Sequence, residues 1–151
     1  MFYLKRFYEY IGFVQGPFVG CTAQTVRALE QQLGIRFPEA YGEYLIFAGE
    51  EAGHLFCEDC TAASLLPELQ QEARDILARC GQAPLPGSFL VFLTHQNYSM
   101  YALDLTTGDD PAVYLFVEPE AIRGWQLAYA TFSACVEAQI DARLEALGVF
   151  C

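Results

Sequence analysis

Apolar residues recur along much of the chain at the three- and four-residue spacing of an amphipathic helix. Such spacing places the apolar side chains on one side of a helix, where they pack against a core. In one such segment Leu29 and Leu33 fall on a side that is apolar except for Glu30. The pattern predicts five helices, over residues 2–14, 23–33, 38–48, 65–80 and 131–147.

Several helix ends carry residues that favour starting or stopping a helix. Thr22 is a good N-cap for the helix that begins at residue 23, and Gly34 ends it. Pro38 is tolerated in the first turn of the next helix, because its missing N–H has no partner there. Gly49 is expected to end that helix in the left-handed conformation.

The period then changes in the second half of the chain. The runs FLVFLT (89–94), MYALDL (100–105) and AVYLFV (112–117) are rich in β-forming residues and are separated by turn sequences. Three runs at this spacing predict an antiparallel meander. The 151 residues, 54% of them hydrophobic, suffice for one domain with a core. We therefore expect a single α+β domain over 1–151, in which helices pack around a small, mainly antiparallel sheet.

The charge is strongly negative and unevenly distributed. Eight Lys and Arg stand against 19 Asp and Glu, which gives a net charge of −11. Residues 41–151 contain sixteen of the acidic and four of the basic residues. Such a surface repels nucleic acid and anionic membranes and attracts basic partners. The composition therefore argues against a role in binding nucleic acid or a membrane, although an acidic surface also serves solubility alone.

The N-terminal segment lacks the pattern of a signal peptide, because Lys5 and Arg6 interrupt its apolar stretch. No run of 18 apolar residues predicts a membrane span. We therefore expect a cytoplasmic protein whose six cysteines are reduced.

The sharpest candidate for chemistry is the spacing His54-x-x-Cys57-x-x-Cys60. It is compatible with a zinc site or a redox pair, but structural zinc sites usually show a second pair of ligands. The preferred interpretation is therefore two thiols in a loop, with no metal and no cofactor. His54 and His95 are the only bases available to activate a nucleophile, and nothing in the sequence pairs either with one. No catalytic residue is predicted.

Three motifs together resemble one family. Leu29, Glu30, Leu33, Gly34, Phe37, Pro38, Tyr41 and Leu45 form the first motif, Tyr101 to Leu105 the second, and Val113 and Tyr114 the third. Thr131 and Phe132 match the start of the last family helix. The chain resembles the SUKH superfamily over about residues 22–140, with an insertion at about 61–85. The resemblance implies that Phe37-Pro38 is the elbow between two family helices.

Members of this superfamily include a yeast regulator of cell-wall synthesis and many bacterial immunity proteins. The resemblance implies a non-enzymatic immunity protein that binds and neutralises a cognate toxin, often a nuclease or a nucleic-acid-modifying enzyme. Two alternatives remain at this point. The first is a regulatory module that binds endogenous proteins, and the second is a small enzyme built around His54, Cys57 and Cys60.

A partner surface is predicted from charge and from aromatic anchors. Acidic loops would attract a basic toxin, and large aromatic side chains would add lasting affinity. The predicted partner-binding residues are Glu50, Glu51, Glu58, Asp59, Tyr98, Asp109, Asp110, Glu118, Glu120 and Trp125. The three acidic helix residues Glu137, Asp141 and Glu145 are expected to be merely solvated.

Overall fold

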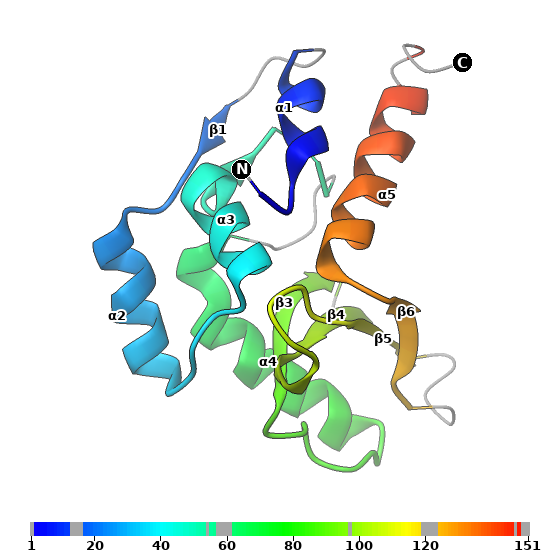
Figure 1. Cartoon of the computed structure of the whole chain (residues 1–151). Coiled ribbons are helices and arrows are strands. Elements are labelled where there is room, and N and C mark those ends of the chain that lie inside the picture. Colours follow the sequence, from blue (N-terminus) through cyan, green and yellow to red (C-terminus); the bar gives the residue numbers. More distant parts are fainter. Residues whose placement is uncertain are drawn as a thin grey trace.

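A computed structural model shows the arrangement of the chain (Figure 1) and describes residues 2–12, 17–53, 55–56, 62–96, 98–118, 124–146 and 148. It has the expected α+β architecture. The helices are α1 (Lys5–Ile11), α2 (Ala23–Leu33), α3 (Glu39–Ala48), α4 (Leu66–Arg79) and α5 (Phe132–Ala146), with short 3-10 turns at Ala63–Leu65 and Leu105–Thr107. The strands are β1 (Phe18–Val19), β2 (Glu51–Ala52), β3 (Phe89–His95), β4 (Ser99–Asp104), β5 (Val113–Val117) and β6 (Gln126–Tyr129).

The predicted ends of α2 are confirmed. The Thr22 side chain accepts a hydrogen bond from the backbone N–H of Thr25, 3.1 Å away. Gly34 ends the helix with a φ of 67°, in the left-handed region that glycine adopts without strain. Local sequence therefore sets both ends of this helix.

Two predictions at the ends of α3 are wrong. Pro38 occupies the N-cap position, just before the helix, with an extended ψ of 148°. Gly49 ends the helix with a right-handed φ of −63°. Glycine is needed here for space instead, since a Cβ at this position would lie 2.6 Å from the carbonyl oxygen of Leu45 and 2.7 Å from Cys21 Sγ.

The elbow between α2 and α3 is held by a side chain from the otherwise apolar side of α2. The Glu30 carboxylate accepts a hydrogen bond of 2.8 Å from the backbone N–H of Phe37. This bond explains why an acidic residue stands between Leu29 and Leu33. Phe37 itself is buried and its ring packs edge-on against that of Tyr41.

The first helix is shorter than predicted. Residues 2–4 precede α1 and are held by Glu43 of α3, whose carboxylate accepts hydrogen bonds from the backbone N–H groups of Phe2, Tyr3 and Leu4. Part of the predicted helix over 2–14 falls on residues 13 and 14, which lie outside the described residues. A tertiary contact therefore replaces the first helical turn.

The predicted meander is confirmed, and a fourth strand extends it. The sheet has the order β3-β4-β5-β6, and all its pairs are antiparallel. The sequence did not predict β6, which is only four residues long, nor the two-residue strands β1 and β2 that pair with each other. In Figure 1 the sheet lies between α4 and the pair α3 and α5.

One continuous core joins the helices to the sheet. Tyr41 of α3 contacts the rings of Phe92 in β3 and Phe132 in α5, at centroid distances of 6.0 and 5.4 Å. On the α4 side, the buried Gln70 donates to the carbonyl oxygen of Val91 and accepts from its N–H. Val91 lies at an irregularity in the pairing of β3 with β4. The Gln70 amide thus serves as a hydrogen-bonding partner for the outer edge of β3.

Candidate interaction surface

Those predicted acidic residues that the structure describes do not gather on one side of the fold. Asp109 and Asp110 come shortly before β5, whereas Glu118 follows its last residue. They therefore lie at opposite ends of this strand. Glu50 and Glu51 lie at the β1–β2 pair. Glu58, Asp59 and Glu120 lie outside the described residues, as do His54, Cys57 and Cys60.

Two of these acids have structural partners. The Asp110 carboxylate accepts hydrogen bonds from the backbone N–H and the hydroxyl of Ser133, in the first turn of α5. Glu118 forms an ion pair with Arg79 at the end of α4, at 2.8 Å. Asp109 has an exposed side chain, and its backbone carbonyl accepts from the N–H of Ala40. A role of these residues in partner binding stays a prediction.

Glu50 also has a local role. Its carboxylate accepts a hydrogen bond from the thiol of the buried Cys21, with a distance of 3.6 Å between oxygen and sulfur. Burial, followed by the charge of Glu50, raises the pKa of Cys21 to about 11. This thiol is therefore protonated at neutral pH and is a poor nucleophile. The neighbouring Glu51 is exposed.

The two predicted aromatic anchors differ in their surroundings. Tyr98 is 38% exposed and makes an edge-on contact with the ring of His95. Trp125 is half-buried, with ring contacts to Phe89 and Phe116 at 5.2 and 5.6 Å. Tyr98 is thus available to a partner, whereas Trp125 packs against the sheet of its own chain.

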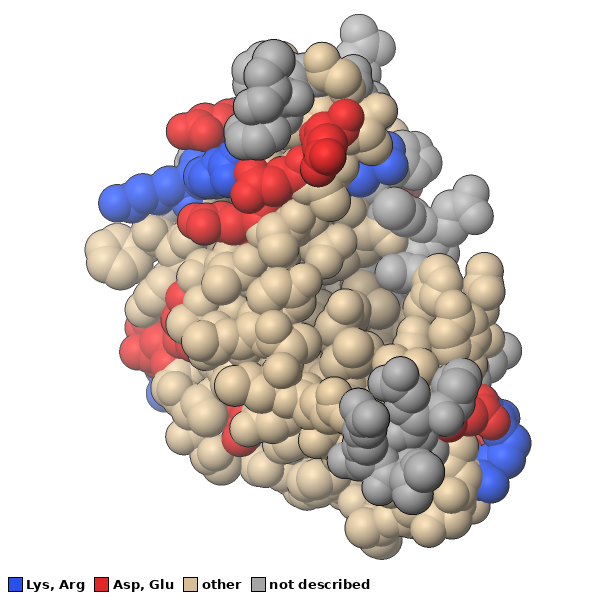
Figure 2. Space-filling view, turned by 90° about the vertical axis from the view of Figure 1, so that its right-hand side faces the viewer, with Lys and Arg blue, Asp and Glu red and all other residues tan. Residues whose placement is uncertain are grey.

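The acidic residues of α5 are not all merely solvated. Asp141 forms a hydrogen-bonded ion pair with Arg6 of α1, and Glu9 lies 3.6 Å from the same guanidinium. The side of the molecule that carries α5 and β6 is shown in Figure 2, where charged side chains of both signs gather over its upper part. The ion pair helps to join the first helix to the last.

Below those charges, Figure 2 shows a wide area without charged side chains, apart from the residues that are drawn in grey. Strand register aligns Tyr101, Leu115 and Gln126 as successive partners across β4, β5 and β6, so that their side chains share one face of the sheet. The ring of Tyr129 lies 6.4 Å from that of Tyr101 on the same face. Leu127 is 59% exposed, but it pairs with Tyr114 and therefore faces the other side. We call Tyr101, Leu115, Gln126 and Tyr129 the β6 surface.

The sequence analysis missed this surface. Its residues belong to three strands, and only the pairing of those strands brings them together. The sequence signal that could have helped is the alternation of side chains along each strand. It places Tyr101 and Leu103 on one side of their strand, and Val113 and Leu115 on one side of the next. That signal predicts which residues share a side of the sheet, but not how far the helices cover it.

The described residues contain no group of three or more His, Cys, Asp or Glu side chains placed to hold a metal ion. None of their helices is both long enough and apolar enough to cross a membrane.

Comparison with known proteins identifies the family. No curated protein matches the chain. Residues 20–138 match the sequence model of the SMI1 / KNR4 family (SUKH-1). The matched segment includes the elbow, the four-stranded sheet and the first half of α5. Because the match covers most of the chain, the protein belongs to the SMI1 / KNR4 (SUKH-1) family.

Proposed function

We propose that the protein is a non-enzymatic immunity protein, which binds a cognate bacterial toxin and neutralises it by covering the toxin's working surface. Membership of a family that includes toxin immunity proteins supports this proposal. The toxin class that fits best is a nuclease or another enzyme acting on nucleic acid. Such enzymes present basic surfaces to their substrate, and a chain of net charge −11 is attracted to them.

The observation that carries the proposal is the β6 surface. The centre of a protein–protein interface is typically poor in charged residues and rich in aromatic ones. The β6 surface has this character, with two tyrosines, a leucine and a glutamine on one face of the sheet. On the side that carries β6, Figure 2 shows charged side chains above and beside an uncharged area, in the place of a polar rim.

The exposed acidic residues fit a second part of the mechanism. Long-range attraction speeds the encounter of oppositely charged proteins, while close apolar contact slows their dissociation. Among the predicted residues, Glu51 and Asp109 have exposed side chains that form no hydrogen bond or ion pair with another described residue. We assign them to attraction and assign Tyr98, at the turn between β3 and β4, to contact with the toxin.

The test is binding to the toxin domain encoded beside the gene, with one pair of matched variants. Gln126→Arg places a bulky charge on the β6 surface, whereas Ile46→Arg introduces the same side chain on α3, where Ile46 is 51% exposed. Because both positions are exposed, neither variant should unfold the protein. Gln126→Arg should weaken binding by about tenfold or more, and Ile46→Arg by less than about twofold.

Stopped-flow association across a salt series should accompany this comparison. The association rate should fall several-fold between low and moderate salt, because ions screen the attraction within about 8 Å at physiological ionic strength. Neutralising Glu51 and Asp109 together should slow association with little change in dissociation. Equal effects of the two arginine variants would contradict the assignment of the β6 surface.

A further inference from the structure

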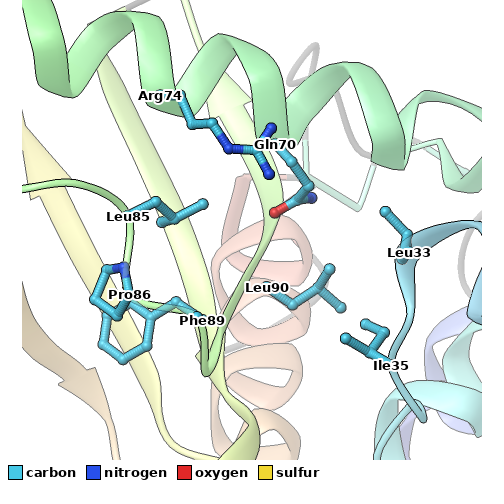
Figure 3. A pocket seen from close by; sticks show the side chains of 9 residues that line it. Leu33, Ile35, Gln70, Arg74, Leu85, Pro86, Phe89 and Leu90 are labelled. Atoms are coloured by element: carbon cyan, nitrogen blue, oxygen red, sulfur yellow. The ribbon is translucent and has the colours of Figure 1, made fainter.

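A groove runs between α4 and the connector from α4 to β3. It consists of two hollows of about 130 and about 240 Å³. Arg74 and Leu85 line both hollows, which are therefore neighbours, and we treat them as one groove. Figure 3 shows the smaller hollow, with Arg74 reaching down from α4 toward the space between Leu85 and Leu33.

Most of the residues that line the smaller hollow are apolar. Leu33 and Ile35 come from the end of α2 and the elbow, and Phe89 and Leu90 come from the start of β3. The buried Gln70 lines it as well, but its amide is already hydrogen-bonded to the backbone of Leu66 and Val91. A cavity of about 150 Å³ with apolar walls accepts a molecule as large as benzene. The smaller hollow is therefore of the right size for one apolar side chain.

Arg74 gives the groove a positive charge in an acidic protein. No Asp or Glu among the described residues lines either hollow. Whereas Arg6 and Arg79 form ion pairs, Arg74 forms none with a described residue. Within the described part of the chain, its one side-chain hydrogen bond is a long one of 3.5 Å to Gln71 Oε1. The guanidinium is therefore available to a carboxylate, which it binds in a charge-assisted, often bidentate manner.

We propose that this groove binds a peptide segment of another protein, in which a carboxylate lies next to apolar side chains. The carboxylate would pair with Arg74, and apolar side chains would enter the hollows beside Leu85. This site goes beyond the proposed function, because it requires the opposite charge in its partner. It also lies elsewhere, since the groove borders β3 and the β6 surface lies at the other edge of the sheet.

The probe is a short acetylated peptide amide with the sequence Ser-Leu-Glu-Leu-Ser, compared with otherwise identical peptides that carry Gln or Lys in the centre. Each is titrated into the isotopically labelled full chain, and backbone amide chemical shifts are followed by NMR. The Glu peptide should give saturable shifts at Gln70, Leu85 and Phe89. The Gln peptide should bind several-fold more weakly, because it lacks the charge that pairs with Arg74.

Charge reversal provides the control. Arg74→Glu should abolish binding of the Glu peptide and create binding of the Lys peptide in the same groove. Arg27→Glu changes the net charge equally at an exposed position of α2 outside the groove, and it should leave the preference unchanged. Toxin binding should be the same in Arg74→Glu as in the natural chain. Failure of the groove proposal can therefore be told apart from failure of the proposed toxin binding.

Three results would overturn the proposal. Shifts that do not saturate, or that spread over the whole surface, would show that the groove is not a binding site. Equal binding of the Glu and Gln peptides would show that Arg74 does not recognise the carboxylate. An equal loss of binding in Arg27→Glu would show that the loss in Arg74→Glu comes from the overall charge of the protein and not from the groove.

Discussion

Tyr41 lies where α3, β3 and α5 meet, and its side chain is completely buried. Its place on the apolar side of a predicted helix indicated this burial. The structure adds that the hydroxyl has no hydrogen-bonding partner among the described residues. Burial raises the pKa of Tyr41 well above its ordinary value, because the phenolate would lose its hydration. Tyr41 thus serves the core through its ring and not through its oxygen.

Substitution of Tyr41 should separate these two contributions. Tyr41→Phe removes an oxygen whose burial is not compensated, and should leave the free energy of unfolding unchanged or raise it by up to about 1 kcal/mol. Tyr41→Asp buries a charge without a partner and should lower it by about 3 kcal/mol or more. Urea denaturation at pH 7 measures both. A clear loss of stability in Tyr41→Phe would show that the hydroxyl is paired after all.

The same residue makes stability depend on alkaline pH. Because the pKa of Tyr41 is higher in the folded than in the unfolded protein, only the unfolded chain releases this proton near pH 10. The raised pKa therefore adds to the free energy of unfolding. This addition is fully present below pH 10 and falls as the pH rises, by up to about 1.4 kcal/mol per pH unit. The Tyr41→Phe variant lacks this proton, and its loss of stability above pH 10 should be correspondingly less steep.

At the scale of the elements, the start of α5 shows how a charge predicted to bind a partner serves the fold. The Thr131 hydroxyl accepts from the N–H of Ala134, while Asp110 accepts from the N–H of Ser133. These groups would otherwise lack partners at the helix end, and a carboxylate there is also favoured by the helix dipole. Asp110 therefore connects the turn before β5 to α5.

The adjacent pair Asp109 and Asp110 allows a direct comparison. Asp110→Ala should lower the free energy of unfolding by about 1 kcal/mol, because it removes the bonds to Ser133. Asp109→Ala removes the same charge from an exposed side chain and should change stability by less than about 0.5 kcal/mol. Thermal denaturation of the two variants measures the difference. Equal losses would mean that the capping bonds contribute nothing specific.

Local rules predicted those elements whose ends and periodicity lie within a short stretch of sequence. Thr22, Gly34 and the three long strand runs are examples. The strand β6 could not be predicted in this way, since its four residues become a strand only by pairing with β5. The conformation of Gly49 was predicted wrongly for a similar reason. Glycine is required there because Cys21, a residue distant in sequence, approaches closely.

The candidate site was harder to predict than the fold. The sequence places acidic residues in turns, but it does not tell that Asp110 caps α5 or that Glu118 pairs with Arg79. Nor does it tell which strand residues the helices leave uncovered. The β6 surface and the Arg74 groove are both products of strand and helix packing across long sequence separations.

For the whole molecule, the charges are arranged so that the two proposed surfaces differ. Many acidic residues have local roles, such as Glu43 at the N-terminal segment and Glu30 at the elbow. Together the acids still give the chain a net charge of −11, which attracts basic proteins from a distance. The β6 surface is uncharged and the groove carries Arg74, so that close contact at each selects a different partner.

The most direct test of the proposed function is neutralisation of the toxin encoded beside the gene. Purified protein is added to a fixed amount of toxin, well above the dissociation constant, and the toxin's activity on its substrate is measured. Activity should fall linearly and vanish at about one equivalent of protein, and the Gln126→Arg variant should require far more. A toxin that stays fully active in excess protein, or substrate turnover by this protein itself, would contradict its assignment as a non-enzymatic immunity protein.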